Sequence, residues 1–228
     1  YRNRGVSKNF LATTQINSWE FWWAVDRTNN VFILDTDGPT LDIVGAVTGL
    51  ARFESIMSVR FLGDRAYVVT FRTTDPLFVF DLHDPQEPRL LGELKVPGFS
   101  SYLHPVGSDY VIGIGLSERW APQVSLFDVS QDDQPRLVDR EDVARFGSWN
   151  YTVSGGASQF DHHAVSFFAD SGILAVPLRR GVPWWGASSS QAAPYALTLL
   201  RVDPQSGIQS LGEIGHDLPV QRSLRIGN

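Results

Sequence analysis

Leu77-Phe78-Val79-Phe80-Asp81, followed after a turn by Leu90-Leu91-Gly92-Glu93-Leu94, is the stretch that decides the fold. Each half is a short apolar run, and the first run closes on an aspartate. The same unit occurs at three other places, Val31–Asp35 with Leu41–Gly45, Ser125–Asp128 with Leu137–Asp139, and Leu199–Asp203 with Leu211–Ile214. A strand-based repeat with a period of roughly forty to fifty residues is typical of a β-propeller.

Each repeat predicts one four-stranded antiparallel blade, which buries both of its faces only by stacking on neighbouring blades. We therefore predict an all-β fold, a single β-propeller domain of about four blades or a fragment of a larger ring. The expected blades are 9–50, 51–98, 99–145 and 158–216, with 217–228 starting the next blade. The first is expected to lack its innermost strand. If Ser223–Ile226 supplied that strand, four blades would close the ring.

The aspartates that close these apolar runs have a structural role in this interpretation. An Asp side chain can accept hydrogen bonds from the backbone N–H groups of the turn that follows it, as in an Asx turn. We predict this role for Asp35, Asp81, Asp128 and Asp203.

Composition narrows the class of protein. The 228 residues are 43% hydrophobic and 12% aromatic, which is enough for a sizeable core. Helix is expected to be scarce, with Glu141–Phe146 as the one stretch of acceptable helical periodicity. The net charge of −6 disfavours a nucleic-acid partner, because phosphate binding needs a basic surface. No apolar run reaches the roughly 20 residues of a membrane-spanning helix, and the absence of cysteine excludes disulfides and Cys-ligated zinc.

Two insertions, at about 141–160 and 180–194, interrupt the repeat, and loops of that length often carry function. Most of the seven tryptophans lie in segments expected to be irregular, namely Trp19, Trp22, Trp23, Trp149, Trp184 and Trp185. Exposed aromatic side chains near arginines suit a protein interface or a carbohydrate-stacking surface. The predicted binding residues are Trp149, Arg179, Arg180, Trp184 and Trp185. Alternatively, these tryptophans cover blade ends or pack on another part of a longer chain.

The histidines are the candidates for a metal site. His104, Asp161, His162 and His163 lie near the expected starts of inner strands, which surround the mouth of a propeller's central channel. Imidazole and carboxylate together suit zinc, copper or another divalent ion. Alternatively, each histidine fixes the packing of neighbouring blades. Adjacent His162 and His163 would point to opposite faces of a strand, so at most one would face a given site.

Longer stretches of the chain, Ser58–Phe71, Thr74–Leu82 and Leu91–Pro105, resemble the secreted bacterial and archaeal "beta-propeller domain" family, which is distantly related to WD40 repeats. The resemblance continues at Phe160–Ala164 and Arg222–Gly227 and covers most of residues 31–228. It implies an extracytoplasmic β-propeller and no particular reaction. The first 30 residues and the two insertions depart from the family, so any function housed there is not implied by it.

Three hypotheses follow. The first is a non-enzymatic extracytoplasmic scaffold that binds a protein or polysaccharide through its loop-bearing face, because no catalytic motif is present. The second is a metal-dependent hydrolase or lyase that uses His104, Asp161 and one of the paired histidines. The third is a structural subunit, completed by other parts of a longer chain or assembly that cover its open strand edges. No cofactor is expected other than such a divalent metal.

Overall fold

The computed structural model of the chain describes residues 10–21, 24–35, 39–71, 75–143, 147–149, 151–154, 157–160, 162–180, 194–224 and 226. These residues form antiparallel β-sheets and a short 3₁₀ turn, η1 (His162–Ala164). No helix within these ranges has the length and apolar character needed to cross a membrane. The predicted all-β fold with four-stranded antiparallel sheets is confirmed. The chain divides into two compact units, which are described separately.

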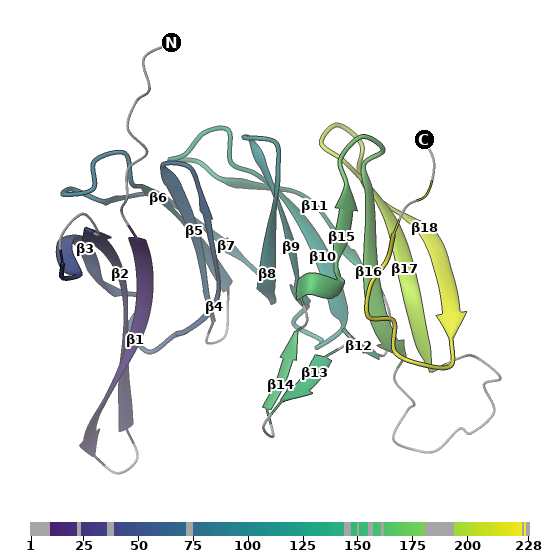
Figure 1. The fold of residues 1–228 in the computed structure, drawn as a ribbon, viewed down its shortest axis with the longest axis horizontal. Helices are drawn as coiled ribbons and strands as arrows, with labels where there is room; N and C mark the ends of the chain where they lie inside the picture. The colour runs from purple at the N-terminus through teal and green to yellow at the C-terminus, as the bar shows by residue number, and fades with distance from the viewer. Residues whose placement is uncertain are drawn as a thin grey trace. The chain divides into compact units, whose positions relative to one another are not determined.

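Unit 1 comprises Tyr1–Lys95 and Asp132–Gln134 and holds two antiparallel sheets (Figure 1). The first sheet has the order β1-β2-β3, with bounds Phe10–Phe21, Ala24–Asp35 and Asp42–Leu50. The second has the order β4-β5-β6-β7, with bounds Ser55–Leu62, Arg65–Phe71, Asp75–Asp81 and Arg89–Val96. Each strand pairs with the next strand in the chain, as the repeat requires.

Unit 2 comprises Val96–Gln131 and Pro135–Asn228. Its first sheet has the order β11-β10-β9-β8, with β8 at Phe99–Val106, β9 at Tyr110–Leu116, β10 at Pro122–Asp128 and β11 at Arg136–Asp142. Its second sheet contains β12 (Gly147–Trp149), β16 (Ile173–Arg180), β17 (Tyr195–Asp203) and β18 (Gly207–His216), and β15 (Ser166–Phe168) also pairs with β16. A separate hairpin joins β13 (Tyr151–Ser154) to β14 (Ala157–Phe160).

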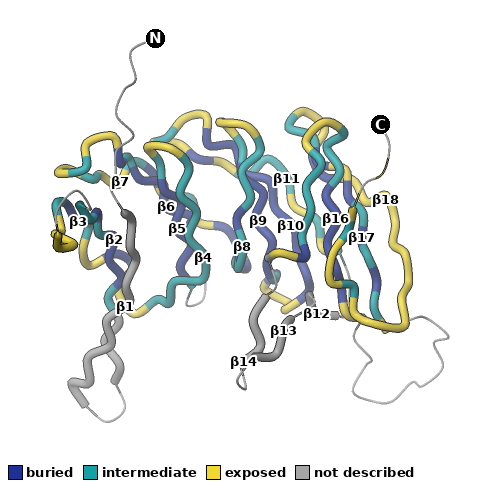
Figure 2. The backbone as a smooth tube through the Cα atoms, viewed as in Figure 1, coloured by how far each residue is buried: buried dark blue, intermediate teal, exposed yellow. Residues whose placement is uncertain are grey.

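The core of each unit consists of the apolar residues of its central strands. In unit 2, side chains from β9, β10, β16 and β17 form one cluster, which includes Ile112, Leu126, Leu174 and Leu200. In unit 1, Val31, Val68 and Phe80 belong to the corresponding cluster. Figure 2 shows β10 buried along its length and β18 largely exposed. Central strands are buried on both faces, so they consist of nearly continuous apolar runs, whereas outer strands do not.

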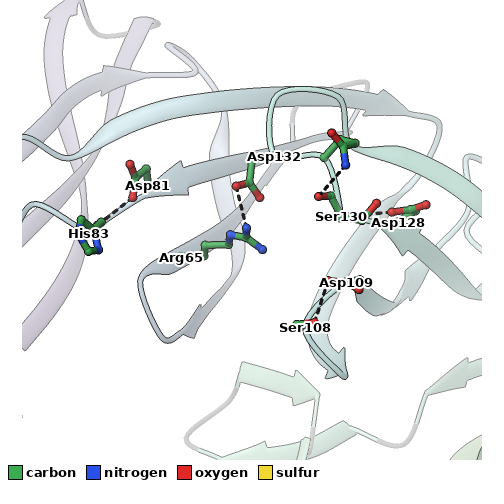
Figure 3. Close-up of polar contacts among 9 residues, drawn as sticks. Arg65, Asp81, His83, Ser108, Asp109, Asp128, Ser130 and Asp132 are labelled. Carbon is green, nitrogen blue, oxygen red and sulfur yellow. Dashed lines mark hydrogen bonds and ion pairs between the residues drawn. The ribbon is translucent and has the colours of Figure 1, made fainter.

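The predicted Asx turns are confirmed at three of the four repeat aspartates. Each carboxylate Oδ1 accepts a hydrogen bond from a backbone N–H two or three residues later, to Asp81 from His83, to Asp128 from Ser130, and to Asp203 from Gln205 and Ser206, at 2.8–2.9 Å. Figure 3 shows the first two of these contacts. The residues that follow Asp35 lie outside the described ranges.

Local predictions for the first insertion and for two tryptophans are wrong. Glu141 and Asp142 do not begin a helix, because they pair with β10 as the last residues of β11. Trp149 lies in β12, where it pairs with Leu178 of β16. Trp19 lies in β1, where it pairs with Val25. In each case hydrogen bonding to a neighbouring strand decides the conformation, and this pairing is stronger than the local preference of the sequence.

The segment predicted to begin a further blade lies beside β15. Its described residues form no strand, but the Ser223 hydroxyl donates to Ser166 Oγ at 3.0 Å. Arg222 Nη1 also donates to the carbonyl oxygen of His163 at 3.1 Å. The chain therefore passes from the outer strand β18 back to the opposite side of the same sheet.

Candidate binding site

One edge of unit 2 collects the ends of several strands. Because the sheets are antiparallel, β9 and β11 end where β8 and β10 begin, and β16 ends where β17 begins. Asp142 at the end of β11 precedes Gly147 by five residues, and Gly147 pairs with Arg180 at the end of β16. Five extended residues span at most about 17 Å. Both strand ends therefore lie at one edge, here called the loop edge, where the two predicted insertions leave the sheets.

A tightly closed loop, Ser117–Ala121, connects β9 and β10 at the loop edge. The Ser117 N–H donates to the Ala121 carbonyl at 2.9 Å, and the Ala121 N–H donates to Ser117 Oγ at 3.2 Å. The Trp120 N–H donates to the Ser117 carbonyl at 2.9 Å. These bonds form a three-residue hairpin loop, in which a turn is followed by one residue in the left-handed region. Hydrogen bonds at both ends hold this loop in one conformation.

Trp120 occupies the left-handed position of this loop. Its φ is +58°, although glycine and asparagine are the residues that adopt this region at least cost. A bulky residue held there costs on the order of 1 kcal/mol. The side chain nevertheless remains 65% exposed, so burial returns little of that cost. An exposed indole at a strained backbone position contributes little to folding stability, and this combination favours a role in binding.

Phe99, the first residue of β8, supports the Trp120 ring. The two ring centroids are 6.1 Å apart and the planes meet at 74°, an edge-to-face arrangement. The preceding residue, Gly98, lies close to the end of β9. Its φ is +93°, and a Cβ there would lie 2.5 Å from the Leu116 carbonyl oxygen, so a side chain at this position would clash. Two segments separated in sequence, the start of β8 and the β9–β10 loop, are thereby brought together.

A pocket of about 350 Å³ lies beside this loop. Its lining consists of Pro97, Ser117, Glu118, Arg119, Gln123, Arg140 and Asp142. Gln123 is buried, and its Nε2 donates to Asp142 Oδ1 at 2.8 Å, which fixes both side chains. Among the described lining residues, two acidic side chains balance two basic ones. The described lining residues include no histidine, lysine or cysteine.

This chemistry suits the binding of an uncharged polar ligand. Carboxylate, amide, guanidinium and hydroxyl groups offer hydrogen-bond donors and acceptors within one small space. Ser117 is the single nucleophile-type residue in the described lining, and its oxygen already accepts the Ala121 N–H. A hydroxyl without a neighbouring base is a weak nucleophile. The pocket therefore favours recognition over covalent chemistry.

The predicted binding residues lie on the same edge where the structure describes them. Arg179 is exposed near the end of β16, and Trp149 pairs with Leu178 beside it through β12. Arg180 ends β16, but its side chain and that of Trp149 are outside the described part. Trp184 and Trp185 also lie outside the described residues. The prediction for these five residues thus stays a prediction.

The histidines are not arranged as expected. His104 lies near the end of β8 and not at its start, since β8 begins at Phe99. Its Nδ1 lies 3.1 Å from the Tyr102 hydroxyl, and its ring packs edge-to-face on Phe167 with 5.5 Å between centroids. The contact with Phe167, which belongs to the next sheet, matches the alternative in which a histidine fixes the packing of neighbouring blades.

The paired histidines belong to the 3₁₀ turn η1, so the prediction that they alternate across a strand is wrong. A 3₁₀ turn rotates successive side chains by about a third of a turn rather than half. The His163 side chain is exposed. No group of three or more metal-binding side chains occurs among the residues described here. Asp161 and the side chain of His162 lie outside them, so the metal site stays a prediction.

Sequence reasoning missed Trp120 and the pocket. Trp120 is the one tryptophan that the sequence analysis did not place in an irregular segment. The sequence signal that could have indicated an exposed tryptophan was its position in the short turn between two strands, two residues before Pro122. The pairing of Gln123 with Asp142 had no local signal, since the two residues belong to different strands.

Comparison with known proteins agrees with the sheets and the repeat. The model of the family described as "Beta propeller domain" matches residues 9–227. The chain belongs to the beta propeller domain family. The described residues that line the loop-edge pocket all lie within the matched range.

Relatives occur in archaea. An uncharacterized protein of Methanocaldococcus jannaschii is 48% identical over 130 residues, which are 57% of this chain and 20% of that protein. An uncharacterized protein of Archaeoglobus fulgidus is 39% identical over 149 residues, 65% of this chain and 22% of that protein. The chain thus spans about a fifth of the length of these relatives. The resemblance was to a secreted bacterial and archaeal family, and both of these relatives are archaeal.

A solved structure also aligns with this beta propeller domain. The crystal structure of Saccharomyces cerevisiae Sqt1 covers 83% of this chain and 59% of its own, with a TM-score of 0.43 and 11% sequence identity.

Proposed function

We propose that this chain is a non-enzymatic, extracytoplasmic binding module that holds a protein or polysaccharide at the loop edge of unit 2. The observation that carries the proposal is the exposed, conformationally strained Trp120 beside a polar pocket. Functional sites are where strained backbone and exposed aromatic side chains are found together. The propeller fold alone would not support a specific function, because the same fold serves many.

The scaffold supports this role through rigidity. The loop begins and ends on β9 and β10, whose apolar residues are almost wholly buried in the core of unit 2. Binding residues on loops are effective when a rigid framework positions them, because less conformational freedom is lost on binding. Arg179 adds an exposed cation at the same edge.

The metal-dependent alternative has less support. His104 already engages Tyr102 and Phe167, and the described pocket lining contains no histidine. A bound metal would require ligands that converge on one point.

The test uses the 228-residue chain on two arrays, one of glycans and one of purified cell-surface proteins. We expect a ligand on one array whose signal falls in Arg119→Ala and is retained in Arg89→Ala. Arg89 is a matched control because it is also exposed and is paired with Glu87 in unit 1. Absence of a ligand on both arrays, or equal loss in both variants, would count against the proposal. Fractionation of cells that produce the protein tests the extracytoplasmic location.

A further inference from the structure

We infer that the pocket beside Trp120 is a saccharide-binding subsite, in which the Trp120 indole stacks on the face of an uncharged sugar ring. This inference rests on the proposed function and names its ligand class. It follows from three properties of the described residues: the presentation of the indole, the chemistry of the pocket lining and the balance of its charges.

The indole is presented as a fixed platform. The Ser117–Ala121 hydrogen bonds set the loop, and the Phe99 ring contacts the indole in an edge-to-face arrangement. Most of the side chain still faces solvent, at 65% exposure. Aromatic side chains with one apolar face supply large contact area at low entropic cost, because only two torsions need to be held. A sugar ring has an apolar C–H face that suits such a platform.

The lining supplies hydrogen bonds of the kind that sugar hydroxyls need. A hydroxyl is both donor and acceptor, so it can bond to carboxylate, amide and guanidinium groups alike. Gln123 and Asp142 are held by their mutual hydrogen bond, whereas Glu118 and Arg119 come from the same loop as Trp120. Polar groups positioned before binding fix the orientation of a ligand and give specificity.

The charge and size of the pocket favour an uncharged saccharide over other ligands. Arg119 and Arg140 are balanced by Glu118 and Asp142, so the described part of the lining offers no excess positive charge to phosphate or sulfate. Protein interfaces are instead depleted of Glu and Asp, whereas the described lining contains Glu118 and Asp142. A volume of about 350 Å³ is at the lower end of the range for small-molecule sites. One or two sugar rings match it better than a flat protein epitope does.

The experiment screens the 228-residue chain against neutral and acidic oligosaccharides, then titrates the strongest hit by calorimetry. Trp120→Gly is the main variant, because glycine is the least strained residue at φ +58° and the loop should still close. Trp120→Phe keeps a smaller aromatic platform. Phe53→Gly is the matched control, since Phe53 is also exposed with a positive φ but belongs to unit 1.

We expect a neutral oligosaccharide to bind, and Trp120→Gly to weaken its affinity by about tenfold or more. Trp120→Phe should lose less, and Phe53→Gly should bind as the wild type does. The urea midpoint of Trp120→Gly should be no lower than that of the wild type, which separates loss of binding from loss of folding. A shift of tryptophan fluorescence on ligand addition should disappear in the same variant.

Other outcomes overturn the inference in distinguishable ways. Saccharide binding that is unchanged in Trp120→Gly places the site elsewhere and leaves the proposed function intact. Binding only of acidic saccharides contradicts the charge argument. A protein ligand without any saccharide ligand also overturns the inference while the proposed function stands. If neither class binds, both proposals fail.

Discussion

In unit 2, the carboxylate of Asp139 accepts a hydrogen bond from the backbone N–H of Ile208, with 2.7 Å between Oδ2 and N. Asp139 belongs to β11 and Ile208 to β18, so the bond joins the outer strands of two sheets. Its other oxygen accepts the Arg140 N–H at 2.8 Å. Ile208 itself packs in the core that both sheets share. A polar bond thus accompanies the apolar contact between neighbouring repeats.

Removal of this bond should destabilise the protein. Asp139→Ala leaves the Ile208 N–H without its carboxylate acceptor, and we expect the free energy of unfolding to fall by about 1–2 kcal/mol. Urea unfolding followed by circular dichroism measures the change. Asp133→Ala, an exposed turn position, should change the free energy by less than about 0.5 kcal/mol. Equal stability of the two variants would show that the bond between the sheets contributes nothing.

Gly207, the residue before Ile208, should tolerate no side chain. Its φ is +84°, and a Cβ there would lie 2.3 Å from Asp139 Oδ2. Gly49 has a similar φ of +74° with no atom near its Cβ position, so Gly49→Ala reports the backbone cost alone. We expect Gly207→Ala to unfold at lower urea than Gly49→Ala. Since the clash is with one side chain, adding Asp139→Ala should recover part of the difference. Midpoints that coincide would contradict this account.

Asp128 should make stability fall in acid. Burial raises the pKa of Asp128, but hydrogen bonds from Ser130 and the ion pair with Arg136 together lower it below its ordinary value of about 3.8. At pH values between the pKa of Asp128 in the folded protein and 3.8, the unfolded chain binds more protons than the folded protein. Stability therefore decreases as the pH falls through the pKa of the folded state. Well above pH 3.8, where the carboxyl is ionised in both states, the contribution of Asp128 is fully present.

The test compares the wild type with Asp128→Asn by urea unfolding from pH 6 to pH 2. At pH 6 we expect the variant to be less stable by about 1–2 kcal/mol, because the charged hydrogen bonds to Arg136 weaken. The gap should narrow as the pH falls below about 3.8, the ordinary value for Asp. Asp170→Asn, at an exposed turn, should follow the wild type at every pH. A gap that is independent of pH would disprove the linkage.

His104 should contribute to packing and not to metal binding. His104→Ala removes the contacts with Tyr102 and Phe167, so we expect a lower free energy of unfolding and an unchanged metal content. Elemental mass spectrometry of the native protein, beside urea unfolding, measures both. His163→Ala, at an exposed position, should alter neither quantity. A stoichiometric metal lost in both variants would instead restore the metal-dependent hydrolase hypothesis.

Much of the fold could be predicted because its signals are local. The apolar run Leu77–Phe80 forms β6 for the same reason that Val124–Phe127 forms β10: residues buried on both faces make a central strand. The aspartate that closes each run bonds to the next turn, within three residues in sequence. Such features repeat wherever the unit repeats, so neighbouring residues are sufficient to reveal them.

The candidate site could not be predicted in this way. The position of His104 depends on where β8 begins, which the turn at Gly98 decides through its approach to Leu116. Glu141, in the one stretch with acceptable helical periodicity, pairs instead with β10. Both outcomes depend on contacts between strands that lie apart in the chain.

The sequence by itself thus determined the strands, their order within each repeat and the turns at the repeat aspartates, because these depend on periodicity and on hydrogen bonds between near neighbours. Only the tertiary structure decided that Trp120 is exposed and contacts Phe99, and that its loop lines a pocket with Gln123 and Asp142. The physical reason is that a pocket is formed by packing between segments distant in sequence. The amino-acid type of a residue does not by itself indicate which distant residue it will contact.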